Sequence, residues 1–409
     1  MKILLIVDCY LPAPKSSAKQ MHDLGVEFRR RGHEVTVLTT THEIERNFDI
    51  STEEGLVVAR VKTRQIKGAA KPLRAFNEVR LSTVVWRRAR KFLLNNPADL
   101  IVFYSPAIFW GSLVWRLKSM WQCPAYLILR DIFPKWTVDT NVLRPGLIHR
   151  YLRWKEIQQY VSADVIAVQS PGDLEYFAQN FTDRPDRLDV LYNWTALDEP
   201  HLPRTEYRTR LGLDNKVVFF YGGNLGIAQD LDNIVRLASS LTGYPEIHFL
   251  LVGEGSEAGR LRKAIREKGL ANIQVLPPTE QLDYLSMVSE FDVGLVTLDR
   301  RLTTHNIPGK ILGYLYWGLP VLASLNPGND LFDLLGKSQA GFCFLNGEDE
   351  KLNVAALRLA KDARLRAQMG QKGRVLLRET FSVETAAQEI LQHFPNRIRQ
   401  GQTELSVAH

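Results

Sequence analysis

The chain has 409 residues, of which 45% are hydrophobic and 24% charged, and its formal net charge is +7. This length predicts about two domains, and the composition excludes disordered and collagen-like proteins. Cys9, Cys123 and Cys343 are widely spaced and form no CxxC pair, which argues against a disulfide framework and against a zinc site.

The first apolar run is short and is halted by Asp8, so it predicts a β-strand rather than a secretory signal. The longest uncharged stretch, residues 100–115, is shorter than the roughly 18 residues that a membrane-spanning helix needs. We therefore expect no transmembrane helix.

Strand-like apolar runs alternate with helical patterns through the first half, which is typical of βαβ units in a doubly wound domain. A strand at residues 3–7 is followed by a helix near residues 18–31 and a strand at 35–38. Further strands are expected at residues 100–103, 125–129, 165–168 and 190–192. The polar, proline-containing stretch 198–204 is the expected interdomain linker.

The alternation resumes in the second half and ends with a helical pattern at residues 383–393. Strands are expected there at residues 217–221, 248–252, 273–276, 293–296 and 320–323. The sequence therefore predicts an α/β protein with Rossmann-like domains at residues 1–197 and 206–380. A C-terminal helical segment, 381–409, is expected to pack back on the first domain.

Four polar residues follow the first strand, at the edge where open α/β sheets place ligands. They are Lys15, Ser16, Ser17 and Lys19. We expect them to line a cleft on the acceptor side, and an ordinary solvated loop is an equally good explanation.

Two glycine-containing turns follow strands in the second half and are candidates for binding a nucleotide sugar. Gly223 and Asn224, with Gln229 close behind, follow one strand, and Gly253 and Glu254 follow another. Glycine lets a backbone approach a ligand closely, although a tight turn alone also explains it. Glu254 suits either a helix cap or a hydrogen bond to a ribose.

The segment 305–321 is the most informative of the chain. Pro308 suits a first helical turn, Gly309 removes side-chain bulk, and Lys310 adds a positive charge beside exposed helix amides. These residues, with Asn306 beside them, predict a diphosphate site. A structural turn explains the glycine and proline but leaves Lys310 in a helix turn that disfavours cations.

In this order and spacing, the motifs resemble those of GT-B fold glycosyltransferases of the retaining family-four type. The resemblance covers nearly the whole chain, at residues 31–35, 223–226, 251–255, 291–295 and 308–321. It implies two Rossmann-like domains facing across a cleft, a UDP-sugar donor, retention of configuration, and no metal or other cofactor. The order of motifs from residue 308 to 330 is similar to bacterial O-antigen and capsule transferases that handle sugars of the N-acetyl-L-fucosamine type.

The sequence departs from the family pattern at several positions. His305 and Gly313 stand where many members carry two Glu, so His305 is a catalytic candidate. Asn224 and Gln229 lie near the places of the usual Arg and Lys, and Lys310 is expected to neutralise the diphosphate instead.

In the first domain, Asp131 stands where the family carries a His or Asp facing the reacting sugar. The resemblance implies that Asp131 is the acid/base group, with Arg130 as its catalytic neighbour. From the residues alone, an Asp at a strand end is more often a cap.

Between Arg60 and Lys91 the chain has eleven basic residues and one acid, and seven of its eight Trp lie in the first half. Such a composition favours lipid phosphates and an anionic membrane surface. We expect a polyprenyl-diphosphate-linked saccharide as acceptor and a cytoplasmic protein peripheral on the inner face of the cell membrane. The candidate interface residues are Trp86, Phe92, Trp110, Trp115 and Trp121. Ordinary packing is the alternative for Trp110 and Trp115.

No recognised motif for nucleic acid accompanies the basic stretch, so no nucleic-acid partner is expected. Two other functions remain open at this point. A nucleotide-sugar 2-epimerase of the same architecture needs no lipid acceptor, and a non-catalytic partner in glycan assembly would bind donor without turnover.

Overall fold

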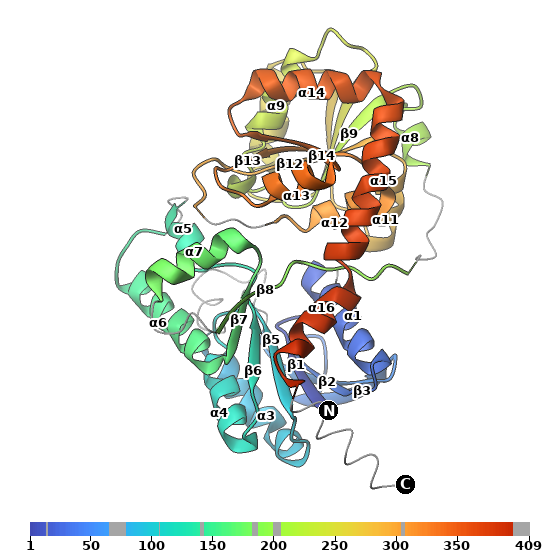
Figure 1. The fold of residues 1–409 in the computed structure, drawn as a ribbon. Helices are drawn as coiled ribbons and strands as arrows, with labels where there is room; N and C mark the ends of the chain where they lie inside the picture. The colour runs from blue at the N-terminus through green and yellow to red at the C-terminus, as the bar shows by residue number, and fades with distance from the viewer. Residues whose placement is uncertain are drawn as a thin grey trace. The chain divides into compact units, whose positions relative to one another are not determined.

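The computed structural model describes residues 1–13, 15–64, 79–105, 107–139, 143–181, 187–198, 206–303 and 307–395. Its contacts divide the chain into two compact units, of which unit 1 comprises residues 1–196 with the chain from residue 383 onward, and unit 2 comprises residues 197–382. Each unit is an α/β domain built on its own sheet (Figure 1). Most of the expected linker lies outside the described residues.

Unit 1 has an eight-stranded sheet in the order β3-β4-β2-β1-β5-β6-β7-β8, parallel except for the pair β3 and β4. Without β3, its first six strands follow the Rossmann order, in which the chain reverses direction across the sheet between β1 and β5. The strands are β1 (Lys2–Ile6), β2 (Glu34–Thr41), β3 (Phe48–Glu53), β4 (Leu56–Lys62), β5 (Leu100–Tyr104), β6 (Ala125–Ile128), β7 (Val165–Val168) and β8 (Leu188–Val190). The helices are α1 (Ser16–Arg30), α3 (Leu81–Asn95), α4 (Gly111–Trp121), α5 (Lys135–Asp139), α6 (Leu147–Ser162), α7 (Pro171–Asn180) and α16 (Val383–Gln392).

Alternate residues of the buried strands feed two cores, as the period of a strand requires. Leu4 and Ile6 face a core completed by α3, α4 and α7, whereas Ile3 and Leu5 face a core completed by α1 and α16. Helix α16 packs directly against α1. The end of the described chain is therefore part of the core of unit 1.

Unit 2 has a six-stranded parallel sheet in the order β11-β10-β9-β12-β13-β14, which is again the Rossmann order. The strands are β9 (Val217–Gly222), β10 (Ile247–Val252), β11 (Ile273–Leu276), β12 (Val293–Thr297), β13 (Val321–Leu325) and β14 (Gly341–Leu345). The helices are α8 (Tyr207–Arg210), the 3-10 turn η2 (Ile227–Gln229), α9 (Asp232–Ser240), α10 (Ala258–Glu267), α11 (Gln281–Ser289), α12 (Lys310–Trp317), α13 (Leu331–Ser338), α14 (Asp349–Lys361) and α15 (Ala363–Thr380). The prediction of two Rossmann-like domains is confirmed.

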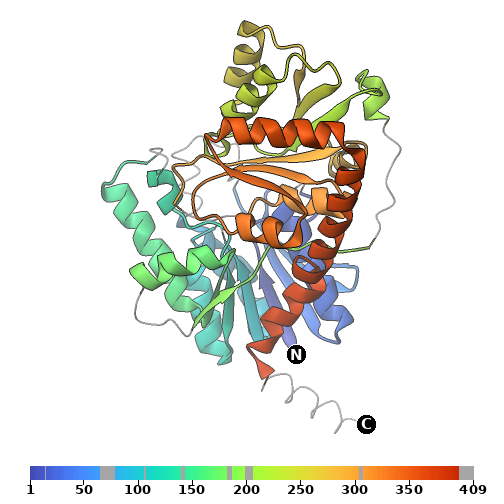
Figure 2. The same cartoon turned by 45° about the horizontal axis from the view of Figure 1, so that its top comes forward.

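Asp362 lies between the long helices α14 and α15 in the chain, and the turned view of Figure 2 shows these two helices meeting end to end at an angle. The Asp362 side chain accepts a hydrogen bond of 2.8 Å from the Leu365 amide. This cap satisfies one amide at the start of α15 and separates the two helices.

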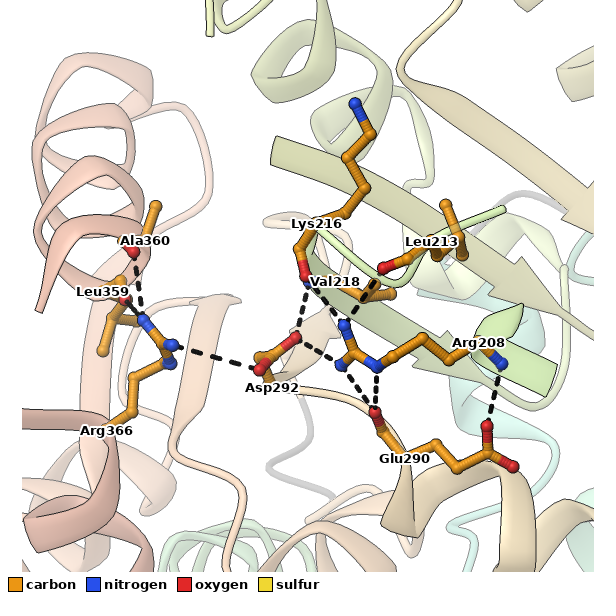
Figure 3. Close-up of polar contacts among 9 residues, drawn as sticks. All are labelled: Arg208, Leu213, Lys216, Val218, Glu290, Asp292, Leu359, Ala360 and Arg366. Atoms are coloured by element: carbon orange, nitrogen blue, oxygen red, sulfur yellow. Dashed lines mark hydrogen bonds and ion pairs between the residues drawn. The ribbon is translucent and has the colours of Figure 1, made fainter. Parts of the chain in front are cut away.

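An ion-pair network holds the amino-terminal ends of β9 and β12 together (Figure 3). The Asp292 carboxylate accepts from an Arg208 guanidinium nitrogen at 2.7 Å and from the Val218 amide at 2.9 Å. The same guanidinium donates to the Glu290 and Lys216 carbonyls, and Arg366 of α15 approaches Asp292 at 3.9 Å. Asp292 therefore connects two strands with α8 and α15.

Three strands, β3, β4 and β14, were not expected from the sequence, whereas every expected strand is present within a few residues. Among the described residues, no helix is both long and apolar enough to cross a membrane.

Candidate functional site

The candidate donor site of unit 2 lies where β9 and β12 are neighbours, at the reversal of strand order. In open α/β sheets this position, outside the carboxyl ends of the strands, is where ligands bind. Gly222 ends β9, and Lys310 begins the helix after β12.

The two glycine turns that follow β9 and β10 pack against each other through their backbones. Gly223 and Gly253 have φ of +126° and +155°, a region that favours glycine. A Cβ added to Gly253 would lie 1.9 Å from the Gly223 carbonyl oxygen, and one added to Gly255 would lie 2.3 Å from that of Leu225. Only glycine therefore fits at position 253, because any Cβ there would clash with the adjoining turn.

Asn224 and Gln229 bind each other instead of projecting independently. The Asn224 amide nitrogen donates to Gln229 Oε1 at 3.0 Å, and the Gly226 amide donates to the same oxygen at 3.2 Å. Tyr221 donates its hydroxyl proton to the Asn224 carbonyl at 2.8 Å. These bonds fix the turn and leave Gly223 and Asn224 exposed. Glu254 is also exposed, and its carbonyl accepts from the Leu225 amide.

Lys310 brings a positive charge to this turn from the first position of α12. Its Nζ lies 3.4 Å from the centroid of the Tyr221 ring, and a Cβ added at Gly223 would lie 3.8 Å from it. The residue as a whole is partly exposed, yet its ammonium group is desolvated, which holds the pKa of Lys310 well below its usual value. Among the described residues no carboxylate pairs with this ammonium.

The start of α12 adds backbone donors beside Lys310. Gly309 occupies the N-cap, and the Ile311 and Leu312 amides donate to the Pro308 and Gly309 carbonyls at 3.1 and 3.2 Å, so the amides that a ligand could reach are those at the very start of the helix. The helix ends at Gly318, whose φ of +72° is left-handed, a conformation that favours glycine. Pro308 and Gly309 thus lie with Lys310, whereas His305 and Asn306 lie outside the described residues.

Tyr314 fixes α12 to both strands of the reversal point. Its buried hydroxyl accepts from the Gly222 amide at 3.2 Å and donates to the Leu295 carbonyl at 3.2 Å. Sequence reasoning assigned no role to Tyr314 or Tyr221. The spacing of the sequence could have pointed to Tyr314, because it lies four residues after Lys310 and therefore on the same face of the helix.

The candidate acid/base residue lies at the corresponding edge of unit 1. Asp131 follows β6 and lies near the buried hydroxyl of Tyr104 at the end of β5. The Arg130 charge lowers the pKa of that hydroxyl, and the charges of Asp131 and Asp8 raise it. The pKa of Tyr104 is raised above its usual value, mainly because burial removes water from the phenolate. Asp131 is partly exposed.

Arg130 is buried and is used to hold the loop after β8. Its guanidinium donates to the Leu191 and Tyr192 carbonyls and lies 4.9 Å from the centroid of the Trp194 ring. Only 6% of the residue is exposed. These contacts fit a positioning residue for Asp131 better than a group that touches substrate.

The four polar residues after β1 lie around the start of α1. Lys15 is the N-cap, Ser16 is exposed, and the Ser17 hydroxyl lies 3.4 Å from Cys9 Sγ. Lys19 forms an ion pair with Asp23, whose pKa is nevertheless raised because its burial outweighs that pair. Lys19 is therefore partly neutralised, and Ser16 is the more accessible of the four.

The aromatic residues expected at a membrane differ in how far they are exposed. Trp110 is fully buried in the core of unit 1, so its assignment as an interface residue is wrong. Trp86, Phe92 and Trp121 pack against the same core, whereas Trp115 is 60% exposed. Arg60 is paired with Glu53, and residues 65–78 of the basic stretch lie outside the described residues.

Within the described residues, no group of three or more His, Cys, Asp or Glu side chains is arranged to hold a metal ion. Independence from metal stays a prediction.

Comparison with known proteins adds independent evidence. The family model "Glycosyltransferase Family 4" matches residues 17–199, and "Glycosyl transferases group 1" matches residues 203–376. The putative colanic acid biosynthesis glycosyl transferase WcaI of Escherichia coli K12 is 30% identical over 179 residues, which are 44% of this chain but only 39% of WcaI.

Solved structures share the fold over nearly the full length. Sucrose-phosphate synthase of Thermosynechococcus elongatus has a TM-score of 0.73 at 16% identity and covers 98% of this chain and 100% of its own. HepE of Anabaena in complex with UDP-glucose has a TM-score of 0.69 at 18% identity, covering 97% of this chain and 100% of its own. A glycosyltransferase family model thus matches each of the two Rossmann-like domains, and the chain shares the two-domain GT-B fold of these solved structures.

Proposed function

We propose that this chain transfers a sugar from a UDP-sugar to a saccharide carried on a polyprenyl diphosphate, in O-antigen or capsule assembly. The observation that carries the proposal is the Lys310 ammonium, which lies over Tyr221 beside Gly223 without a carboxylate partner among the described residues. The match to WcaI, named for colanic acid biosynthesis, and the fold shared with HepE, solved with UDP-glucose, support this class of reaction.

The donor diphosphate would lie between the start of α12 and the Gly223 turn. An ammonium and helix amides there would bind its oxygens and stabilise the charge that grows as the leaving group departs. In the reaction, the acceptor hydroxyl oxygen bonds to the anomeric carbon while the bond from that carbon to the diphosphate oxygen breaks. UDP leaves with the bonding electrons.

Asp131 would orient the acceptor hydroxyl or take its proton. Arg130 would act through Asp131, because its own guanidinium is occupied by the Leu191 and Tyr192 carbonyls. Retention, a donor such as UDP-N-acetyl-L-fucosamine, independence from metal, and peripheral attachment to the inner face of the cell membrane complete the proposal. The sequence motifs support these details.

Titration with UDP tests the donor site directly. Losing a charge-assisted contact is worth about 1.5–3 kcal/mol, so Lys310→Ala should weaken UDP binding about 10- to 100-fold in calorimetry. Lys337→Ala is the control, since that lysine is 80% exposed on α13. An unchanged Kd in Lys310→Ala, or an equal loss in Lys337→Ala, would show that the diphosphate binds elsewhere.

Product analysis tests the reaction. Transfer to a lipid-linked saccharide should release UDP and leave the anomeric configuration unchanged, as read by NMR. Conversion of UDP-N-acetylglucosamine to its manno epimer without acceptor would instead identify a 2-epimerase.

A further inference from the structure

Helix α6 of unit 1 carries an unusual stripe of large apolar side chains on its outer face. Leu147 is 83% exposed, Tyr151 36%, Trp154 52% and Val161 66%. At 100° per residue these four positions fall within about 80° of arc, so they share one face of the helix, which Gln158 interrupts between Trp154 and Val161. Ile148, 67% exposed, extends it at the amino-terminal end.

Trp115 of α4 extends this stripe at its other end. Gly111, Trp115 and Lys118 share one face of α4 because they are four and three residues apart. A Cβ at Gly111 would lie 2.8 Å from the Gln159 backbone, and Lys118 pairs with Asp164 at 2.6 Å. Trp115 lies between these two contacts along α4, on the side of that helix that packs against α6. Figure 1 shows α4 and α6 on the same side of the sheet.

The exposed charge around the stripe is mainly positive, and Asp164 at its far end is paired with Lys118. Arg144, Arg150 and Arg116 are exposed, and the Lys155 ammonium lies 4.5 Å from the Trp154 ring centroid. In residues 111–121 and 143–162 the only carboxylate is Glu156, which is fully buried against Arg153 and Tyr160. The neighbouring α3, on the same core, adds exposed Arg87, Arg90 and Lys91.

We propose that this surface, formed by the outer face of α6 and Trp115, inserts into an anionic membrane. This deepens the proposed function, on which it rests, by naming where the enzyme meets the bilayer that carries its acceptor. Contiguous exposed apolar groups mark an interaction surface, and Trp and Tyr with flanking Arg and Lys suit the headgroup boundary. Two copies apposed through this surface would instead bring their own cations together, which disfavours a dimer.

Flotation with vesicles tests the surface. The wild-type protein should float with vesicles of phosphatidylglycerol and phosphatidylcholine, and less with phosphatidylcholine alone. Leu147→Ser/Trp154→Ser should lower partition at least about tenfold, since each side chain loses most of its insertion energy. Arg150→Ala/Lys155→Ala should lower it about 30-fold on the anionic vesicles, near fivefold for each charge.

Matched control variants distinguish insertion of this surface from nonspecific adsorption of the protein to vesicles. Val354→Ser, which removes a 64% exposed apolar residue from α14, and Lys337→Ala should float like the wild type. UDP titration of each variant reports the donor site separately, so a failed Lys310 prediction and a failed membrane prediction are distinguishable. Absence of wild-type flotation, or equal flotation of the α6 variants, would overturn the inference. So would a wild-type dimer that Leu147→Ser/Trp154→Ser dissociates without any vesicle binding.

Discussion

Replacing Asp292 by Ala should destabilise unit 2 without touching its candidate donor site. The Asp292 side chain is 22% exposed and accepts from Arg208 at 2.7 Å and from the Val218 amide at 2.9 Å. Losing the charged hydrogen bond costs about 1.5–3 kcal/mol, and leaving a buried amide without acceptor costs about 1–3 kcal/mol. Because solvent reaches part of the group, we take the low end of the sum, about 2.5 kcal/mol. For a domain of this size that lowers Tm by about 5–10 °C.

The assay is thermal unfolding, with amide hydrogen exchange of β9 and β12 to assign the loss to unit 2. Asp292→Asn should lose less, since its carbonyl oxygen can still accept from Val218. Asp333→Ala is the control, because its pair with Lys337 is 74% and 80% exposed and should contribute little. UDP binding well below the melting point should be unchanged, because the network is at the opposite ends of the strands from Gly223. If Asp292→Ala and Asp333→Ala have the same Tm, the Asp292 network does not stabilise unit 2.

Three further predictions concern unit 2. Gly253→Ala should lower Tm and weaken UDP binding, because its Cβ would lie 1.9 Å from the Gly223 oxygen, whereas Gly243→Ala, with no atom within 4 Å, should melt and bind like the wild type. Tyr314→Phe should cost about 1–3 kcal/mol in denaturant unfolding by leaving the Gly222 amide and Leu295 carbonyl unpaired; no loss would mean that water replaces the hydroxyl. Burial lowers the pKa of His248 from 6.5 to about 4, so the stability that its neutral form provides is complete above pH 6.5 and is lost as pH falls toward 4. His248→Gln should remove up to about 3 kcal/mol of this acid sensitivity in unfolding titrations, and an unchanged pH profile would contradict the assignment.

The buried strands could be predicted because both faces are covered and their residues form continuous apolar runs. The strands that escaped prediction lie toward the sheet edges. In β3 (Phe48–Glu53) apolar and polar residues are mixed, and β14 (Gly341–Leu345) is only partly buried. Such strands depend on pairing with a neighbour, which the local pattern does not reveal.

Prediction of the candidate site succeeded for local geometry and stopped at contacts between distant segments. The start of α12 follows from Pro308, Gly309 and Lys310 in sequence. That Tyr221 would lie beneath Lys310 depends on the pairing of β9 with β12, which brings together residues about 90 apart. Trp110 and Trp115 are equally hydrophobic, and only the packing of α4 decides that one is buried and the other exposed.

Unit 1 is assembled from two separated parts of the chain, and α16 supplies Ala387, Ile390 and Leu391 to one of its cores. As the ribosome elongates the chain, all of unit 2 is synthesised before that helix exists. The second domain can thus mature first, while the part of the earlier-made core that α16 covers stays exposed until residues 383–392 have been synthesised. A stop codon just before this helix would leave unit 2 whole and expose the hydrophobic interior of unit 1 to aggregation and proteolysis.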